Sequence, residues 1–212
     1  MSRVVATKQP PVARFPRERL GDSELVEAVV RGDTAAVGVV WERYSEHVRG
    51  VLKGALGFDA AVEDLLQDVF VAFIKGASEL RDPGALRAYL VSVGIRIVFG
   101  ELRRRRVRRW VMLSPEGEVP ESPQSPADVE GALALRALYR LLDELPARRR
   151  VVFALRQIEG LEVMEVAAAL RISDSTVKRE ARKARETIVK RAERAEPLLW
   201  EYIRRLDGGG GG

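Results

Sequence analysis

The sequence predicts an all-α protein of two helical domains joined by a flexible linker rich in proline and acidic residues, with a helix-turn-helix in the second domain. Apolar residues recur at helical spacing along most of the 212 residues, and the two-residue alternation typical of strands is missing. Between 114 and 126 the chain has four prolines and one glycine, a composition that forms neither a helix nor a core. We therefore place the first domain at 22–110, the linker at 111–128 and the second domain at 129–207.

The two ends of the chain are expected to lie outside these domains. Residues 1–21 carry arginines and prolines but no apolar stretch, which predicts a disordered basic arm and excludes a secretory signal. Residues 208–212 form a glycine tail that cannot pack. No window approaches the roughly 18 apolar residues of a membrane span, so no membrane insertion is expected. Cysteine is absent and His47 is the only histidine, which excludes disulfides and Cys/His zinc sites; we expect no metal and no cofactor.

Four helices are predicted in the first domain. They cover Ser23–Arg31 with Asp22 or Ser23 as cap, Thr34 to about Arg49, Ala61–Lys75, and a long segment from near Pro83 to about Arg109. The helix at 61–75 has a predicted buried stripe made of Val62, Leu66, Val69, Phe70 and Phe73. Asp64 and Asp68 lie one turn apart on its outer face, with Gln67 beside them. From spacing alone a solvated acidic face is the more common explanation, and the functional one is a docking surface for a basic helix.

The end of the fourth helix concentrates positive charge. Residues 102–110 hold six arginines and no acid, whereas 111–130 hold five acids and no base. Four consecutive arginines, 103–106, cover all sides of a helix, so they do not form a single solvated stripe. A helix C-terminus favours cations, but nucleic-acid phosphate is the favoured partner. The segregated charges indicate separate surfaces for a basic partner and for nucleic acid.

The second domain is predicted to contain a helix-turn-helix at 160–185. The helices of the second domain are predicted at Val129–Glu144, Ala147–Ile158, Glu162–Leu170 and Asp174–Arg194, followed by a short helix at Pro197–Arg205. Ser173 is placed to cap the recognition helix. Arg171 occupies the turn, where a positive φ is often needed and a non-glycine residue costs on the order of 1 kcal/mol.

The recognition helix has a basic, hydrogen-bonding outer face. Its buried stripe is predicted to be Val177, Ala181, Ala184 and Ile188. Ser175, Arg179 and Arg182 point away from this stripe. Thr176 and Lys183 lie on one flank, and Lys178 and Arg185 lie on the other. A face of this kind suits a DNA groove, and the alternative is an ordinary amphipathic hairpin with a solvated basic face.

In their order and spacing these motifs resemble the extracytoplasmic-function (ECF) group of bacterial RNA polymerase sigma factors, over about Asp22–Ile188. The resemblance implies a cytoplasmic, non-enzymatic protein that binds core RNA polymerase and directs promoter-specific transcription initiation. An anti-sigma factor is a further partner that it suggests. It implies that the β′ clamp helices bind Glu63, Asp64, Gln67 and Asp68, and that the second domain touches the β flap. It implies contacts with promoter DNA at the minus-ten element through Arg96, Arg103, Arg104, Arg105 and Arg106, and at the minus-thirty-five element through Ser175, Thr176, Lys178, Arg179, Arg182 and Lys183.

Two residues of the fourth helix depart from the family pattern. Arg96 stands where the family usually has Asn, and Gly100 stands where it usually has Asp. These departures leave an alternative, a sigma-like regulator deficient in promoter opening that titrates polymerase or an anti-sigma partner. A two-domain repressor or activator with a similar helix-turn-helix would leave the acidic face unexplained. The chain has no GxxxxGK[ST], GxSxG or HExxH motif that would indicate an enzyme.

Overall fold

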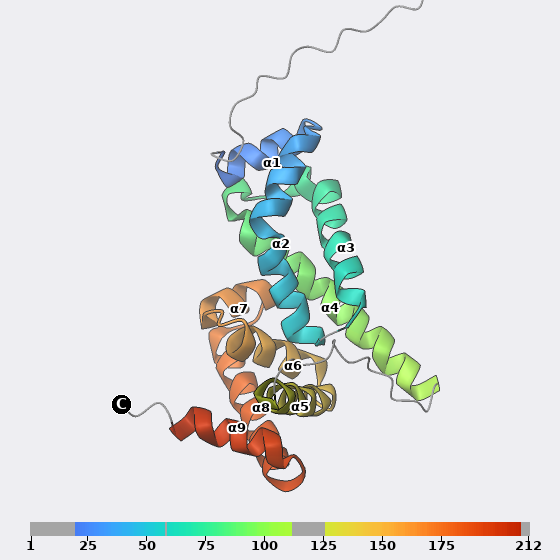
Figure 1. Cartoon of the computed structure of the whole chain (residues 1–212). Helices are drawn as coiled ribbons and strands as arrows, with labels where there is room; N and C mark the ends of the chain where they lie inside the picture. Colours follow the sequence, from blue (N-terminus) through green and yellow to red (C-terminus); the bar gives the residue numbers. More distant parts are fainter. Residues whose placement is uncertain (1–19, 58, 112–125, 209–212) are drawn as a thin grey trace, which may run out of the picture.

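The computed structural model describes residues 20–57, 59–111 and 126–208, and it is helical throughout these ranges (Figure 1). The N-terminal half consists of α1 (Asp22–Val30), α2 (Thr34–Leu56), α3 (Ala61–Gly76), the short 3-10 turns η2 (Ala77–Glu79) and η3 (Pro83–Ala85), and α4 (Leu86–Val111). The C-terminal half consists of α5 (Pro126–Asp143), α6 (Ala147–Phe153), the π-helical turn η4 (Ala154–Ile158), α7 (Val163–Leu170), α8 (Asp174–Ala195) and α9 (Pro197–Gly208). The all-α prediction is confirmed. Most of the predicted basic arm, of the glycine tail and of the predicted linker lies outside the described residues.

Several helix boundaries differ from the prediction. The first helix was expected to use Asp22 or Ser23 as its cap, but Gly21 is the cap and Asp22 lies in the first turn, where it accepts a hydrogen bond of 2.6 Å from the Tyr44 hydroxyl. The described helices also narrow the predicted linker, because α4 continues through Val111 and α5 begins at Pro126. Proline is tolerated there because the first turn of a helix leaves its N–H groups without partners.

The helix α2 is longer than predicted. It was expected to end near Arg49, but it continues to Leu56 and ends where Gly57 adopts a φ of 85°. The added turns are held by the core, since Val51 and Leu52 are fully buried. Burying each such side chain stabilises the fold by about 1.5–3 kcal/mol, which exceeds the roughly 1 kcal/mol cost of a glycine within a helix.

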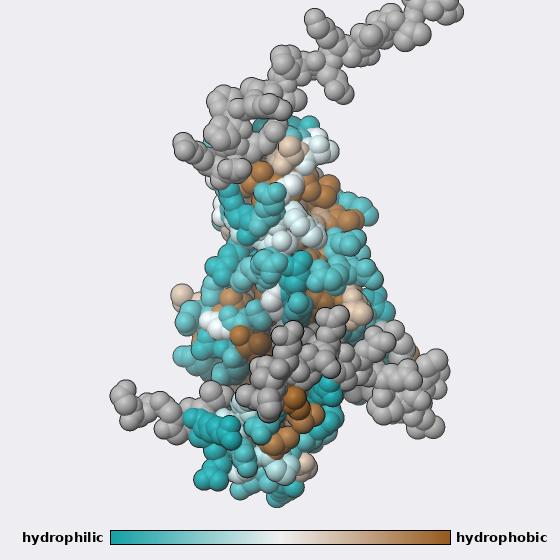
Figure 2. All heavy atoms as spheres, in the orientation of Figure 1, coloured by the Kyte–Doolittle hydropathy of each residue, from teal (hydrophilic) through white to brown (hydrophobic). Residues whose placement is uncertain are grey.

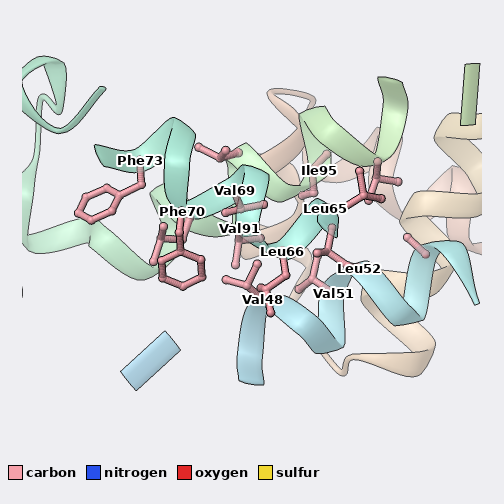
Figure 3. Close-up of a cluster of buried hydrophobic side chains, with 14 of the residues drawn as sticks. Val48, Val51, Leu52, Leu65, Leu66, Val69, Phe70, Phe73, Val91 and Ile95 are labelled. Atoms are coloured by element: carbon pink, nitrogen blue, oxygen red, sulfur yellow. The ribbon is translucent and has the colours of Figure 1, made fainter. Parts of the chain in front are cut away.

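The core of the N-terminal half lies between α2, α3 and α4 (Figure 3). All five residues of the predicted α3 stripe are buried. Figure 3 shows Leu66, Val69 and Phe70 of this stripe beside Val48 of α2 and Val91 of α4. The Trp41 and Phe70 rings add an aromatic contact with centroids 4.6 Å apart. This packing fixes the rotation of α3, so its opposite face is held toward solvent.

The two halves of the chain are in contact. The α2 helix runs from α1 down to the helices of the C-terminal half, where it meets η4, and α4 meets α7 (Figure 1). The larger hydrophobic core therefore includes Val151, Leu155 and Val166 of the C-terminal half. A second core lies between α5, α8 and α9 and includes Leu142 and Ile188. The structure thus joins two sets of helices for which the sequence predicted separate domains.

Candidate nucleic-acid interface and acidic docking face

The outer face of α3 presents two exposed aspartates to solvent. Asp64, Gln67 and Asp68 are exposed, opposite the buried stripe. Within the described part of the chain neither aspartate makes an ion pair. Glu63 differs, because Arg49 of α2 donates hydrogen bonds of 2.9 and 3.2 Å to its two carboxylate oxygens. We call Asp64, Gln67 and Asp68 the acidic face.

Exposed apolar residues continue this surface toward the end of α3. Val71 and Ile74 are each 45% exposed. Figure 2 shows hydrophobic atoms at the molecular surface over the upper end of this helix. Charged side chains beside accessible apolar ones on a rigid helix are typical of a protein-binding surface. The structure therefore adds two apolar residues to a surface that the sequence described by charge alone.

The arginines of α4 divide into exposed and engaged side chains. Arg96, Arg103 and Arg106 are exposed. Arg104 donates to buried Glu101 at 2.9 Å. These side chains keep cationic groups on the surface of α4, but they are not equally free to move toward a phosphate.

The Arg105 side chain is bound to other residues of the protein. It bonds Glu101 at 3.2 Å and donates to the carbonyl oxygen of Leu56, also at 3.2 Å. It also pairs with Asp59, so it ties α4 to the segment that follows α2. Two carboxylates thus neutralise its charge locally. Sequence periodicity does not separate this arginine from its neighbours, because two of its partners, Leu56 and Asp59, lie 49 and 46 residues earlier in the chain.

The turn of the helix-turn-helix has the predicted backbone. Arg171 adopts the left-handed conformation, with φ 52° and ψ 48°, which confirms the expected positive φ. The N–H of Ile172 donates to the carbonyl of Ala167 at 3.0 Å and closes the end of α7. The Ser173 hydroxyl oxygen accepts from the N–H of Thr176 at 3.3 Å, which confirms it as the cap of α8. These contacts fix the direction in which α8 leaves the turn.

The recognition helix α8 buries the predicted stripe and exposes the predicted cations. Val177, Ala184 and Ile188 are buried, and Ala181 is half-buried. The exposed polar residues are Ser175, Lys178, Arg179, Arg182 and Lys183, while Thr176 is half-buried and bonded through its hydroxyl to Ser173. Because the stripe packs inward, the basic face points to solvent, as expected from helical rotation.

Glu180 lies within this basic surface, and the sequence analysis did not single it out. Its carboxylate accepts a hydrogen bond of 3.2 Å from Arg149 of α6 and lies 3.5 Å from Arg179. Burial raises the pKa of Glu180, but the two arginines outweigh that effect and hold its pKa below the usual range. The carboxylate therefore stays ionised at neutral pH and restrains Arg179. A glutamate within a run of basic residues could have been noticed as a departure from a purely cationic face.

Two general features limit the chemistry of the described residues. No described helix is long and apolar enough to cross a membrane. Within the same ranges no group of three or more His, Asp or Glu side chains is arranged to hold a metal ion.

Comparison with known proteins identifies the family. The ECF sigma factor family model matches residues 22–195. The chain is 25% identical to the ECF RNA polymerase sigma factor SigM of Mycobacterium tuberculosis, over 85% of this chain and 92% of the relative. It is 26% identical to the ECF RNA polymerase sigma-E factor of Escherichia coli, over 86% and 98% of the two chains. It is 32% identical to the ferric citrate uptake sigma factor FecI of Escherichia coli, over 61% and 73%.

The fold agrees with that of a solved structure. CnrH, in a complex with the cytosolic domain of CnrY, superposes with a TM-score of 0.59 at 22% identity, over 82% of this chain and 98% of that one. The family match spans both the acidic helix and the helix-turn-helix. The chain belongs to the ECF sigma factor family and is an RNA polymerase sigma factor that binds RNA polymerase and promoter DNA and directs transcription initiation.

Proposed function

We propose that the acidic face of α3 docks on the β′ clamp helices of core RNA polymerase. The observation that carries this proposal is that Asp64 and Asp68 are exposed, and make no ion pair with any described residue, on a helix whose other side packs into the core. Charged groups in this state attract a basic partner without first breaking an internal ion pair. Glu63 contributes less, because Arg49 already neutralises it. Val71 and Ile74 supply the apolar part of the contact.

The basic surfaces contact the two promoter elements in this proposal. On α4, Arg96, Arg103 and Arg106 approach the minus-ten element, and the exposed residues of α8 read the minus-thirty-five element with the C-terminal half seated on the β flap. Arg179 is the principal candidate for base reading, since its side chain is exposed and lies 3.5 Å from the Glu180 carboxylate, which restrains it. A restrained arginine loses less side-chain entropy when it binds a guanine edge.

An anti-sigma factor is a further proposed partner. The solved structure of CnrH is a complex with the cytosolic domain of CnrY, which supports the same class of partner for this chain. The C-terminal half offers a cavity of ≈ 500 Å³ between α5, η4, α8 and α9, lined by apolar side chains that include Leu138, Ile158 and Ile203. An apolar side chain from a partner helix would fit this cavity.

The docking proposal is tested by charge reversal on α3. In the Asp64→Lys/Asp68→Lys variant we expect affinity for core polymerase to fall at least tenfold, with helicity unchanged. The matched control is Glu130→Lys/Glu193→Lys, which changes net charge equally at two exposed positions of the C-terminal half. Binding is measured by pull-down of purified core polymerase, and activity by run-off transcription. Equal affinities for the two double variants would place the docking surface elsewhere.

A further inference from the structure

The final turns of α4 extend beyond the packed body of the protein. Leu102 is the last side chain of this helix that the structure describes as buried. Arg103 and Arg106 are exposed, and Val107 is 58% exposed. Figure 1 shows these turns leading away from α2 and from the C-terminal half. We call residues 103–111 the arm. Its direction has to be set by contacts other than the packing of apolar side chains.

A glycine lies at the base of the arm. Gly100 is an interior residue of α4, and glycine weakens a helix because it leaves the backbone more conformational freedom. A Cβ atom at this position would lie in open space, with no described atom of another part of the chain within 4 Å. Packing therefore does not require a glycine here. Since Arg96 precedes it and Arg103 follows it, α4 bends most easily between these two exposed arginines.

Glu101 and Arg105 connect the arm to the body just after this glycine. Glu101 is only 5% exposed, and its carboxylate accepts a hydrogen bond of 3.2 Å from Arg105. The same guanidinium donates to the carbonyl oxygen of Leu56, the last residue of α2, at 3.2 Å and pairs with Asp59. Asp59 in turn accepts a hydrogen bond of 2.7 Å from the N–H of Ala61, the first residue of α3. One side chain thus ties the arm to the end of α2 and to the start of α3.

Helical rotation separates Arg105 from the exposed arginines. At about 100° per residue, Arg103 lies within roughly 20° of Arg96, whereas Arg105 lies about 180° from it. Arg96 and Arg103 are accordingly exposed on one side of α4, and half-buried Arg105 turns toward the body. The rise along the axis from Arg96 to Arg103 is about 10.5 Å. A bend at Gly100 would change this spacing.

We propose that Glu101 and Arg105 form a brace that holds α4 straight across Gly100, and that Arg105 is a positioning residue for the minus-ten contact. This inference rests on the proposed contact of Arg96 and Arg103 with the minus-ten element. Phosphate contacts fix the register of a protein on DNA. Two cations that a braced helix already holds at a fixed spacing need less ordering when they bind. Arg105 therefore supports promoter affinity without touching DNA.

The mobility of the arm tests the brace in the absence of DNA. The chain has no cysteine, so a fluorescent label on Val107→Cys reports on the arm alone. A label on Val30→Cys of α1, where the side chain is 51% exposed, is the matched control. Arg105→Gln should lower the time-resolved anisotropy of the label on the arm and leave that of the label on α1 unchanged. Adding Gly100→Ala should restore it, because alanine stiffens a helix.

A second variant keeps the charge of Arg105. Asp59→Asn removes the carboxylate that pairs with this arginine, while its amide oxygen still accepts the hydrogen bond from Ala61. We expect the same rise in arm mobility as in Arg105→Gln, with helicity unchanged by circular dichroism. Asp59→Asn therefore decides the question if Arg105→Gln fails to fold. An arm of unchanged mobility in the folded variants would overturn the brace.

Promoter affinity tests the positioning role. Holoenzyme assembled with the full chain is bound to a promoter fragment that the wild-type holoenzyme selects from genomic DNA, and the Kd is measured over a range of salt concentrations. Arg105→Gln should raise the Kd by about tenfold with an unchanged salt slope, since two arginines must then be ordered on binding. Gly100→Ala/Arg105→Gln should return the Kd to within about twofold of wild type, because the helix is straightened without the brace.

Arg103→Gln is the charge-matched control. It should lower the salt slope by about one, and Gly100→Ala should not rescue it. If Arg105→Gln lowered the slope in the same way and were not rescued, Arg105 would contact phosphate and the positioning role would be refuted. If Arg103→Gln changed neither the Kd nor the slope, the proposed minus-ten contact would be lost and the positioning role with it, while the anisotropy would still report whether the brace exists.

Discussion

Replacing Arg171 with glycine should stabilise the C-terminal half. Arg171 holds a left-handed backbone at φ 52°, and its side chain is exposed. The left-handed conformation costs an L-residue about 1–2 kcal/mol, and glycine avoids this cost. Glycine also raises the entropy of the unfolded chain, and this effect offsets about 0.4–1 kcal/mol of the gain in stability. The difference predicts a net gain of about 0.5–1 kcal/mol for Arg171→Gly.

The matched control is Arg171→Ala, which removes the same side chain but keeps the Cβ atom. Thermal unfolding followed by circular dichroism should place the Tm of Arg171→Gly above that of Arg171→Ala by about 2–4 °C per kcal/mol, the scale expected for a chain of this size. Urea unfolding should show a higher midpoint with an unchanged slope. If the glycine variant were no more stable than the alanine variant, the strain at this turn would have to be relieved elsewhere.

Three further outcomes follow from the described contacts. Arg179→Ala should relax the sequence preference of the holoenzyme at one or two base pairs, by about 1–3 kcal/mol of discrimination. Lys178→Ala should instead weaken holoenzyme binding evenly across a panel of substituted promoters and lower its salt dependence. Identical profiles for the two variants would exclude base reading by Arg179. Burial raises the pKa of Tyr139 to about 12, so its contribution to the contact between α5 and α2 should be complete below pH 10 and be lost as the pH rises toward 12. Burial and Asp22 also raise the pKa of Tyr44, so ultraviolet titration should show a late component that is reduced in Tyr139→Phe, and a late component unchanged in that variant would contradict the buried hydroxyl. Ile188→Ala should cost about 2–5 kcal/mol in urea unfolding, and a loss below 1 kcal/mol would show that α8 packs loosely.

Local patterns predicted the features that depend on neighbours within one or two turns. The α3 stripe is buried as expected, because helical rotation alone places Leu66 and Phe73 on one side. The cap at Ser173 and the strained backbone at Arg171 are local as well, and both are confirmed. The docking and base-reading roles remain predictions, since they concern partners that the fold does not contain.

Long-range partners decide the rest. Arg148, Arg149 and Arg150 form a basic run, and arginine side chains are mostly exposed in proteins. In the structure they are respectively exposed, half-buried and buried. Only the position of the α2 carboxyl end, almost a hundred residues earlier, selects Arg150 for burial. A sequence pattern gives the rotation of α6 but not the element that covers it, so the burial of Arg150 could not be predicted from periodicity.

The end of α2 was also predicted wrongly, although in this case the sequence contains the feature that explains where the helix ends. Glycines at 50, 54 and 57 weaken a helix, and the helix was predicted to end near Arg49, just before the first of them. Their spacing is helical, however, so they fall on one side of a continuing helix. That side is where Glu159 and Tyr139 approach. A helix that retains its buried stripe while glycines recur on another face is better explained by a close-packed partner than by an early end. The glycines lower the local stability of α2, but they allow the close contact between α2 and the C-terminal half.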